Sequence, residues 1–291
     1  MHYVDQTFDE ERALYGTDAA HVVRCTFDGP ADGESALKET TNLTVEDSDF
    51  RLRYPFWHVN TATITDSRMN EDCRAALWYS DDIEISGSSL GGIKALRECT
   101  NVTIRQSEMQ SAEFGWKCDN LRIEDSSLVS EYAFLSTRHL DIEGLRMQGK
   151  YSFQYVQDGT IRNSHFKTKD AFWHSTNVTV YDTVLEGEYL GWYSENLRLV
   201  RCTIKGTQPL CYARGLVLED CTMEGCDLSF ENSDVIATVI GSIDSVKNPR
   251  SGSIAADSIG EVIIEGAAVH PGECRLIERG EDGLMERRVA C

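Results

Sequence analysis

The string NLTVEDSDF (42–50) decides the fold, because it recurs along the chain at a nearly constant interval. The copies read TATITDSRM (61–69), DIEISGSSL (82–90), NVTIRQSEM (101–109), NLRIEDSSL (120–128), HLDIEGLRM (139–147), DGTIRNSHF (158–166), NVTVYDTVL (177–185), NLRLVRCTI (196–204) and GLVLEDCTM (215–223). The step between these copies is 19 residues, apart from one coil of 21, and further coils start at Ala20 and Val235. Such a repeat is typical of a solenoid, in which each coil packs on its neighbours.

Three columns of like residues recur in the coils. The first apolar column is mostly β-branched and contains Val22, Val45, Ile64, Ile85, Ile104, Ile123, Ile142, Ile161, Val180, Leu199 and Leu218. A small column follows three residues later, with Cys25, Ser48, Ser67, Ser88, Ser107, Ser126, Ser164, Thr183, Cys202 and Cys221, and two residues further lies a second apolar column. Residues spaced by two indicate strands, and the three-residue step indicates a bend.

These patterns predict an all-β fold, a right-handed parallel β-helix of about twelve 19-residue coils. Asp47 and Asp66 lie at the predicted first bend, where Asx turns are favoured. A solenoid must cover its open ends, and segment 5–18 is expected to form a short capping helix. The expected organisation is an N-terminal cap over 1–19, the β-helix over 20–265, and a C-terminal cap or tail over 266–291.

Composition excludes several classes of function. The 291 residues contain 28 Lys and Arg against 48 Asp and Glu, so 28 − 48 gives a net charge of −20. Nucleic acids and anionic membranes bind clustered basic residues, so neither is an expected partner. No stretch approaches 18 apolar residues, and the N-terminus lacks a signal-peptide pattern. We therefore expect a cytoplasmic protein with reduced cysteines.

Cofactor and metal motifs are missing from the sequence. Cys202, Cys211, Cys221 and Cys226 cluster, but their spacings do not match structural zinc modules. The repeat explains most of them as small core residues. Phosphate-binding loops, dinucleotide fingerprints and zinc-protease motifs are absent as well. We expect no metal site and no cofactor.

The third strand of each coil carries all five tryptophans. Its column reads Lys38, Trp57, Trp78, Arg97, Trp116, Leu135, Gln154, Trp173, Trp192, Cys211 and Phe230. Two registers are open. Small residues two positions before and after this column favour tryptophans inside the core, and this is the register we expect. Lys38 and Arg97 oppose it, because an unpaired cation in a core is costly. The competing register places the preceding Phe and Leu column inside and the tryptophans at a corner.

The first five of these coils carry the densest set of ionisable and aromatic side chains. The candidate ligand-binding residues are Lys38, Glu39, Trp57, His58, Tyr79, Arg97, Glu98 and Lys117. A cation over an indole face is a favourable contact, and flat rings along a groove suit sugars. The hypothesis is that this face binds or acts on a carbohydrate, either an oligosaccharide or a sugar acid. The simpler interpretation is a solvated face with ion pairs Lys94–Glu113 and Glu98–Lys117.

Catalysis is left open by the sequence. Glycoside hydrolysis needs two carboxylates about 5–9.5 Å apart, whereas Glu39 and Glu98 lie three coils, or roughly 14 Å, apart. A lyase or epimerase would need a base, and Lys117, Arg97 and His58 are equal candidates. The alternative to carbohydrate binding is a non-catalytic scaffold that forms a homo-oligomer through the same aromatic face.

The chain resembles a bacterial family, domain of unknown function 3737, with the single-stranded β-helix of the pectate-lyase-like superfamily. The resemblance rests on FDEERALYG (8–16), DGPADGESALKE (28–39), RYPFWH (53–58), RAALWY (74–79), GIKALRE (92–98), FGWK (114–117), KDAFWHS (169–175), YLGWYS (189–194) and IDSVKNP (243–249). It covers about residues 5–265 and implies a β-helix in a soluble bacterial protein. It implies no catalytic residues, because the family has no assigned activity.

Overall fold

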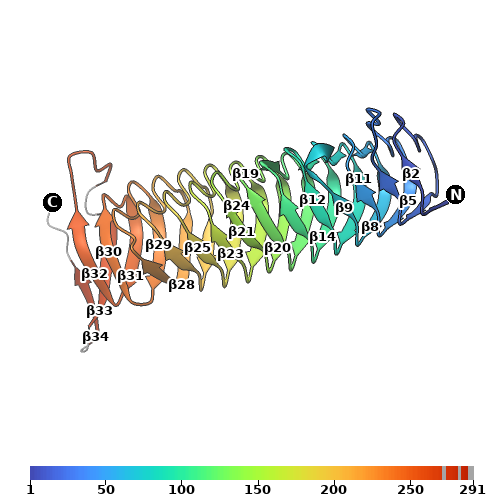
Figure 1. Cartoon of the computed structure of the whole chain (residues 1–291). Coiled ribbons are helices and arrows are strands. Elements are labelled where there is room, and N and C mark those ends of the chain that lie inside the picture. Colours follow the sequence, from blue (N-terminus) through green and yellow to red (C-terminus); the bar gives the residue numbers. More distant parts are fainter. Residues whose placement is uncertain (271–272, 281–282, 288–291) are drawn as a thin grey trace. The chain divides into compact units, whose positions relative to one another are not determined.

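The chain is an all-β parallel solenoid. Its computed structural model describes residues 1–270, 273–280 and 283–287, which form about 14 turns. They divide into two compact units, Met1–Gln148 and Gly149–Cys291, each a stack of coils (Figure 1). No helix in the described part is long and apolar enough to span a membrane.

Three rows of short parallel strands build the first unit. The first row consists of β1 (His2–Val4), β3 (His21–Val23), β5 (Thr41–Glu46), β8 (Asn60–Thr65), β11 (Asp81–Ser86), β14 (Thr100–Arg105), β17 (Asp119–Glu124) and β20 (Arg138–Glu143). The second consists of β2 (Thr7–Phe8), β4 (Thr26–Phe27), β6 (Asp49–Phe50), β9 (Arg68–Met69), β12 (Ser89–Gly91), β15 (Glu108–Gln110), β18 (Ser127–Ser130) and β21 (Arg146–Gly149). The third consists of β7 (Phe56–Trp57), β10 (Leu77–Trp78), β13 (Leu96–Arg97), β16 (Glu113–Phe114) and β19 (Tyr132–Ala133), and a single 3-10 turn, η1 (Glu71–Cys73), follows β9.

The second unit repeats the first two rows. Its own first row consists of β22 (Gln157–Arg162), β24 (Thr176–Tyr181), β26 (Arg198–Val200), β28 (Leu216–Glu224), β29 (Asp234–Val239), β31 (Ser251–Ala256) and β33 (Cys274–Gly280). The other strands are β23 (His165–Lys167), β25 (Val184–Glu186), β27 (Thr203–Lys205), β30 (Ser242–Lys247), β32 (Ser258–Ile263) and β34 (Gly283–Arg287).

The predicted columns are the core. Val45, Ile64, Ile85 and Ile104 pair in register from coil to coil and are at most 1% exposed. The predicted bends are confirmed, since Asp47 and the other aspartates of its column adopt positive φ angles. The four clustered cysteines are buried free thiols in this core.

The predicted N-terminal helix is wrong, because segment 5–18 continues the solenoid. Strand β1 pairs with β3, and Phe8 stacks on Phe27 at a ring-centroid distance of 5.1 Å. The amides of Arg12 and Leu14 donate to the carbonyls of Glu34 and Ala36 in the next coil, at 3.0 and 2.8 Å. Backbone pairing along the next coil therefore outweighs the local helical pattern of this segment.

The predicted number of coils was also too low, at both ends. The first coil starts at Met1, and irregular steps after Val235 obscured the later ones. In the tail, β33 pairs parallel with β31, and β34 returns antiparallel to β33. The predicted capping role of 266–291 stays a prediction, and its residues 271–272, 281–282 and 288–291 lie outside the described residues.

The small column forms a ladder of hydrogen bonds inside the first unit. The Ser88 hydroxyl accepts the amide N–H of Ser67 at 3.0 Å and donates to the Ser86 carbonyl at 2.8 Å. The same pattern repeats at Ser67 and Ser107. Each hydroxyl thus satisfies a buried amide of the preceding coil, which would otherwise be costly to bury.

We expect Ser88→Ala to lower the free energy of unfolding by about 1–3 kcal/mol, because it leaves the buried Ser67 amide without an acceptor. Ser88→Thr is the matched control, because Thr183 naturally fills this column and accepts the Ser164 amide at 3.2 Å. Urea unfolding followed by circular dichroism measures both variants. Equal losses in the two would show that the hydroxyl ladder does not stabilise the fold.

Candidate functional site

The tryptophans lie outside the core, so the register we expected for the third strand is wrong. Phe56 and Leu77 are fully buried, while Trp57 and Trp78 beside them are partly exposed. The competing register, with the Phe and Leu column inside, is the observed one. The argument against a buried tryptophan column, that it would also bury the cations Lys38 and Arg97, therefore holds.

A left-handed residue in each coil explains the error. Tyr79 has φ +52°, and the corresponding residue of the next coil, Glu98, also has φ +52°. Such a residue interrupts the two-residue alternation of a strand, so small residues on both sides can point inward. Ala76 and Leu77 are both buried before this corner, and Ser80 is buried after it. Small residues two positions before and after the tryptophan therefore do not show whether its side chain faces the core or the solvent.

The outward column is a ladder of stacked cations and indoles. Lys38 Nζ lies 4.3 Å from the ring centroid of Trp57, which stacks on Trp78 at 5.7 Å. The Arg97 guanidinium lies 6.0 Å from Trp78 and 5.6 Å from Trp116. Strands β7, β10 and β13 hold Trp57, Trp78 and Arg97 in register. The sequence correctly predicted this order of cations and rings, and we call these five residues the indole ladder.

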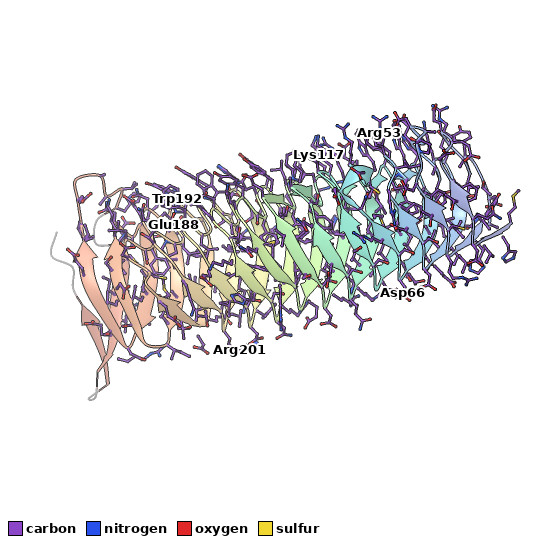
Figure 2. All side chains as sticks on the ribbon, viewed as in Figure 1. Arg53, Asp66, Lys117, Glu188, Trp192 and Arg201 are labelled. Carbon is purple, nitrogen blue, oxygen red and sulfur yellow. The ribbon has the colours of Figure 1, made fainter. Side chains whose placement is uncertain are left out.

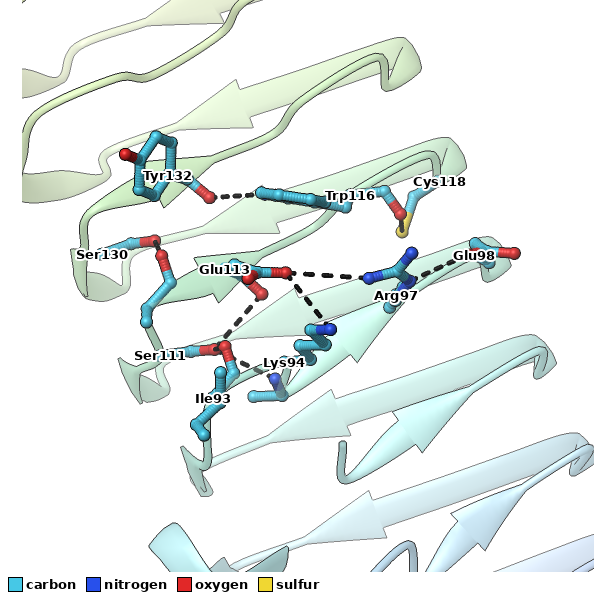
Figure 3. A network of polar contacts seen from close by, with 12 residues as sticks. Ile93, Lys94, Arg97, Glu98, Ser111, Glu113, Trp116, Cys118, Ser130 and Tyr132 are labelled. Atoms are coloured by element: carbon cyan, nitrogen blue, oxygen red, sulfur yellow. Dashed lines mark hydrogen bonds and ion pairs between the residues drawn. The ribbon is translucent and has the colours of Figure 1, made fainter. Parts of the chain in front are cut away.

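Arg97 connects the indole ladder to two carboxylates (Figure 3). Its Nε donates to Glu98 Oε1 at 2.8 Å, and its Nη1 lies 3.7 Å from Glu113 Oε2. Lys94 Nζ also lies 3.7 Å from that oxygen, which confirms the expected Lys94–Glu113 pair. The arginine is thus held by both charge and ring contacts, with only 18% of its side chain exposed.

The neighbouring column, Glu39, His58, Tyr79, Glu98 and Lys117, lies at the left-handed corner itself, and we call it the corner column. His58 stacks between Trp57 and Tyr79, at centroid distances of 5.9 and 5.3 Å. Glu39 accepts a hydrogen bond from Tyr15 Oη at 2.7 Å and lies 3.9 Å from Lys38. The structure therefore brings all eight predicted residues onto two adjacent columns.

Charges at the corner column keep its central carboxylate ionised. Burial acts to raise the pKa of Glu98, but hydrogen bonds from Arg97 and Tyr79 outweigh it, so this pKa lies below its usual range. The same hydrogen bond to Glu98 raises the pKa of Tyr79. Lys117 acts on Glu98 through its charge, and the expected Glu98–Lys117 salt bridge is replaced by Arg97–Glu98.

Lys117 is the exposed cation of this surface. Its side chain lies on the same edge of the first unit as Arg53, away from Asp66 at the first bend (Figure 2). In the part of the chain that the structure describes, no ion pair to Lys117 is found. An ionised carboxylate at Glu98 and an unpaired ammonium at Lys117 suit ligand binding through hydrogen bonds and charge. They do not supply the protonated carboxyl group that a general acid requires.

Comparison with known proteins identifies the family. The model of a family described as "protein of unknown function (DUF3737)" matches residues 1–277. The chain belongs to this family. No curated protein matches the sequence.

Two solved structures resemble this member of the family. The surface adhesin PfbA of Streptococcus pneumoniae is 11% identical, with a TM-score of 0.36, over 98% of this chain and 72% of the adhesin chain. A hyperthermoactive exopolygalacturonase from Thermotoga maritima is also 11% identical, with a TM-score of 0.29, over 92% of this chain and 86% of that chain. These likenesses assign no ligand or reaction to the family member described here.

Sequence reasoning missed a groove that lies beside the indole ladder in the first unit. It is lined by the ends of β9, β12, β15 and β18 and by the η1 turn. Two signals in the sequence pointed to it, the single coil of 21 residues and the adjacent glycines Gly91 and Gly92.

The lowered pKa of Glu98 predicts a pH-dependent contribution to stability. A carboxyl group whose pKa is lower in the folded state stabilises the fold above its unfolded pKa, and loses this effect as pH falls through the folded pKa. We expect the wild type to be more stable than Glu98→Gln at pH 7, and the difference to shrink as pH falls from the ordinary Glu pKa of about 4.3 through the lower pKa of the folded state.

The matched control is Glu84→Gln, on an exposed position of β11 for which the structure describes no ion pair. Chemical unfolding at intervals from pH 7 to pH 3 measures both variants. A constant difference between wild type and Glu98→Gln across this range would contradict the interpretation.

Proposed function

We propose that the protein binds a carbohydrate, an oligosaccharide or sugar acid, through the corner column of the first unit. The proposal rests on one observation, namely that large polar and charged residues occupy the left-handed positions of this column. Only glycine adopts positive φ freely, and Asn and Asp adopt it more readily than most other residues. Large side chains held in this conformation are expected where function requires them.

The other two corners of the same unit follow the usual preference. The first corner mostly has Asp or Gly, at Asp47, Asp66, Gly87, Asp125 and Gly144, and the third mostly has Asn or Asp, at Asn42, Asp82, Asn101 and Asn120. The corner column has neither Asn, Asp nor Gly, and its φ angles of 52–57° are in the same region. Its side chains therefore cost conformational energy that the other two corners mostly avoid, with exceptions such as Gln106 and Thr61.

The chemistry of the corner column suits a hydroxylated ligand. Glu98 accepts hydrogen bonds, Lys117 donates them, and His58 and Tyr79 can do both. The exposed ammonium of Lys117 also fits the carboxylate of a sugar acid. We infer binding rather than turnover as the primary activity, because the charges around Glu98 disfavour its protonated form.

The alternative function is a subunit interface, and it is favoured by the second unit. Tyr155, His174, Tyr193 and Tyr212 stack there in one exposed column, at successive centroid distances of 5.1, 5.1 and 4.9 Å. Tyr155 and Tyr193 are 49% and 43% exposed. Light scattering of the purified chain tests this alternative: a dimer that Tyr193→Ala converts to a monomer supports it, and a strict monomer excludes it.

The proposed binding surface predicts opposite effects on stability and affinity. We expect Lys117→Asn to raise the free energy of unfolding by up to about 1 kcal/mol, because Asn tolerates the left-handed conformation better than Lys. The same change should weaken binding of a sugar acid about tenfold or more, because it removes the exposed ammonium.

Ser136→Asn is the matched control, one coil further along the same corner, where φ is +56°. It should stabilise the protein without changing affinity. The measurement is a thermal-shift screen against neutral oligosaccharides and sugar acids, in which a ligand at one hundred times its dissociation constant adds about 2.7 kcal/mol. Equal affinity of Lys117→Asn and wild type for every ligand that binds would exclude the corner column as the site.

A further inference from the structure

The groove beside the indole ladder has the dimensions of a ligand site. Its volume is about 870 Å³, within the range of roughly 300–1,000 Å³ that small-molecule sites occupy. It lies wholly within the first unit and spans the coils from Arg68 to Glu131. None of the ten residues of the indole ladder and corner column lines it.

Two glycines and the longer coil create this groove. A Cβ atom on Gly91 would lie 2.8 Å from the carbonyl carbon of Asn70, and one on Gly92 would lie 2.7 Å from the Arg74 carbonyl oxygen. Gly92 also has φ +107°, which side chains rarely adopt. The η1 loop can therefore pack directly on the next coil, where it forms one wall of the groove. The small residues beneath it leave the floor open.

The opposite wall is fixed by hydrogen bonds. The Ser111 hydroxyl accepts the Ala95 amide at 3.0 Å and contacts the Ile93 carbonyl at 3.1 Å, and the Lys94–Glu113 ion pair follows next along the chain (Figure 3). This wall presents Ile93, which is 52% exposed, and the next coils add Val129, which is 53% exposed. The groove thus offers apolar contacts at fixed positions.

Both hydrogen-bond donors and hydrogen-bond acceptors line the same groove. Arg68 donates hydrogen bonds, Glu108 accepts them and the exposed amide of Gln110 does both. Among the residues that the structure describes, neither Arg68 nor Glu108 has an ion-pair partner. They lie on β9 and β15, two coils apart, with β12 between them.

We propose that this groove is a second binding site, for a short neutral oligosaccharide. Apolar patches at Ile93 and Val129 match the C–H face of a sugar ring, and the unpaired Arg68 and Glu108 match its hydroxyl groups. The acidic residues Glu71, Glu108 and Glu131 outnumber Arg68 around the groove and so disfavour anionic sugars, whereas an uncharged sugar meets no such repulsion. The site is built from other residues than the corner column and does not depend on the proposed function there.

The test fills the groove from an exposed position. Val129→Arg places a long side chain over the floor without changing the core, since Val129 points outward from β18. We expect it to weaken binding of neutral oligosaccharides more than tenfold by isothermal titration, with an unchanged melting temperature. The probes are uncharged gluco-, xylo- and manno-oligosaccharides of four to six units, with chitosan oligomers and oligogalacturonides as charged comparisons.

Gln148→Arg is the matched control, because Gln148 is the exposed residue of the same column one coil beyond Val129 and does not line the groove. It should bind as the wild type does, and so should Lys117→Asn. Binding that is lost in Lys117→Asn but kept in Val129→Arg would place the ligand at the corner column instead. Absence of binding to all neutral probes, or stronger binding of a charged probe, would overturn the proposal.

Discussion

The fold depends on the hydrogen bond made by one buried backbone amide at each bend. A residue with positive φ turns the chain, and the following amide then points into the core, where it needs an acceptor. The hydroxyl of the next coil supplies it, as Ser88 does for Ser67 at 3.0 Å. Small hydroxyl or thiol side chains are therefore favoured at that position, although Leu145 interrupts the column. The hydrogen bond keeps the coils in register even across the 21-residue coil between Ser67 and Ser88.

The same constraint explains which features could be predicted from sequence. Columns such as Ile64 and Ile85 were predicted because each coil repeats them at constant spacing. The side of Trp78 was not, because the left-handed Tyr79 lets both Ala76, two residues before Trp78, and Ser80, two residues after it, face the core. Segment 5–18 was misread because its helix-like composition outweighed two weak signals, Tyr3 and Phe8, which continue the apolar columns. The groove needed the η1 loop in three dimensions, since Gly91 and Gly92 alone indicate only a close approach.

For the candidate site, the sequence predicted which residues lie together and in what order, but not their individual contacts. All eight residues lie on two adjacent columns, because a coil of fixed length brings equivalent positions together. Arg97 was expected between Trp78 and Trp116, and it lies there. That the Glu98 carboxylate pairs with Arg97 rather than with Lys117 depends on side-chain reach, which a repeat does not encode.

Stacking within the indole ladder also limits how it can recognise a sugar. Trp57 has Lys38 against one face and Trp78 against the other, and Trp78 in turn has Trp57 and Arg97. With both faces occupied, these indoles offer only their edges, and the indole N–H groups of both are buried. Contacts with a ligand at this corner must therefore come from polar groups such as Glu98 and Lys117. Apolar contacts with a sugar face are available instead at Ile93 and Val129, which is why the groove and the corner column are complementary rather than competing surfaces.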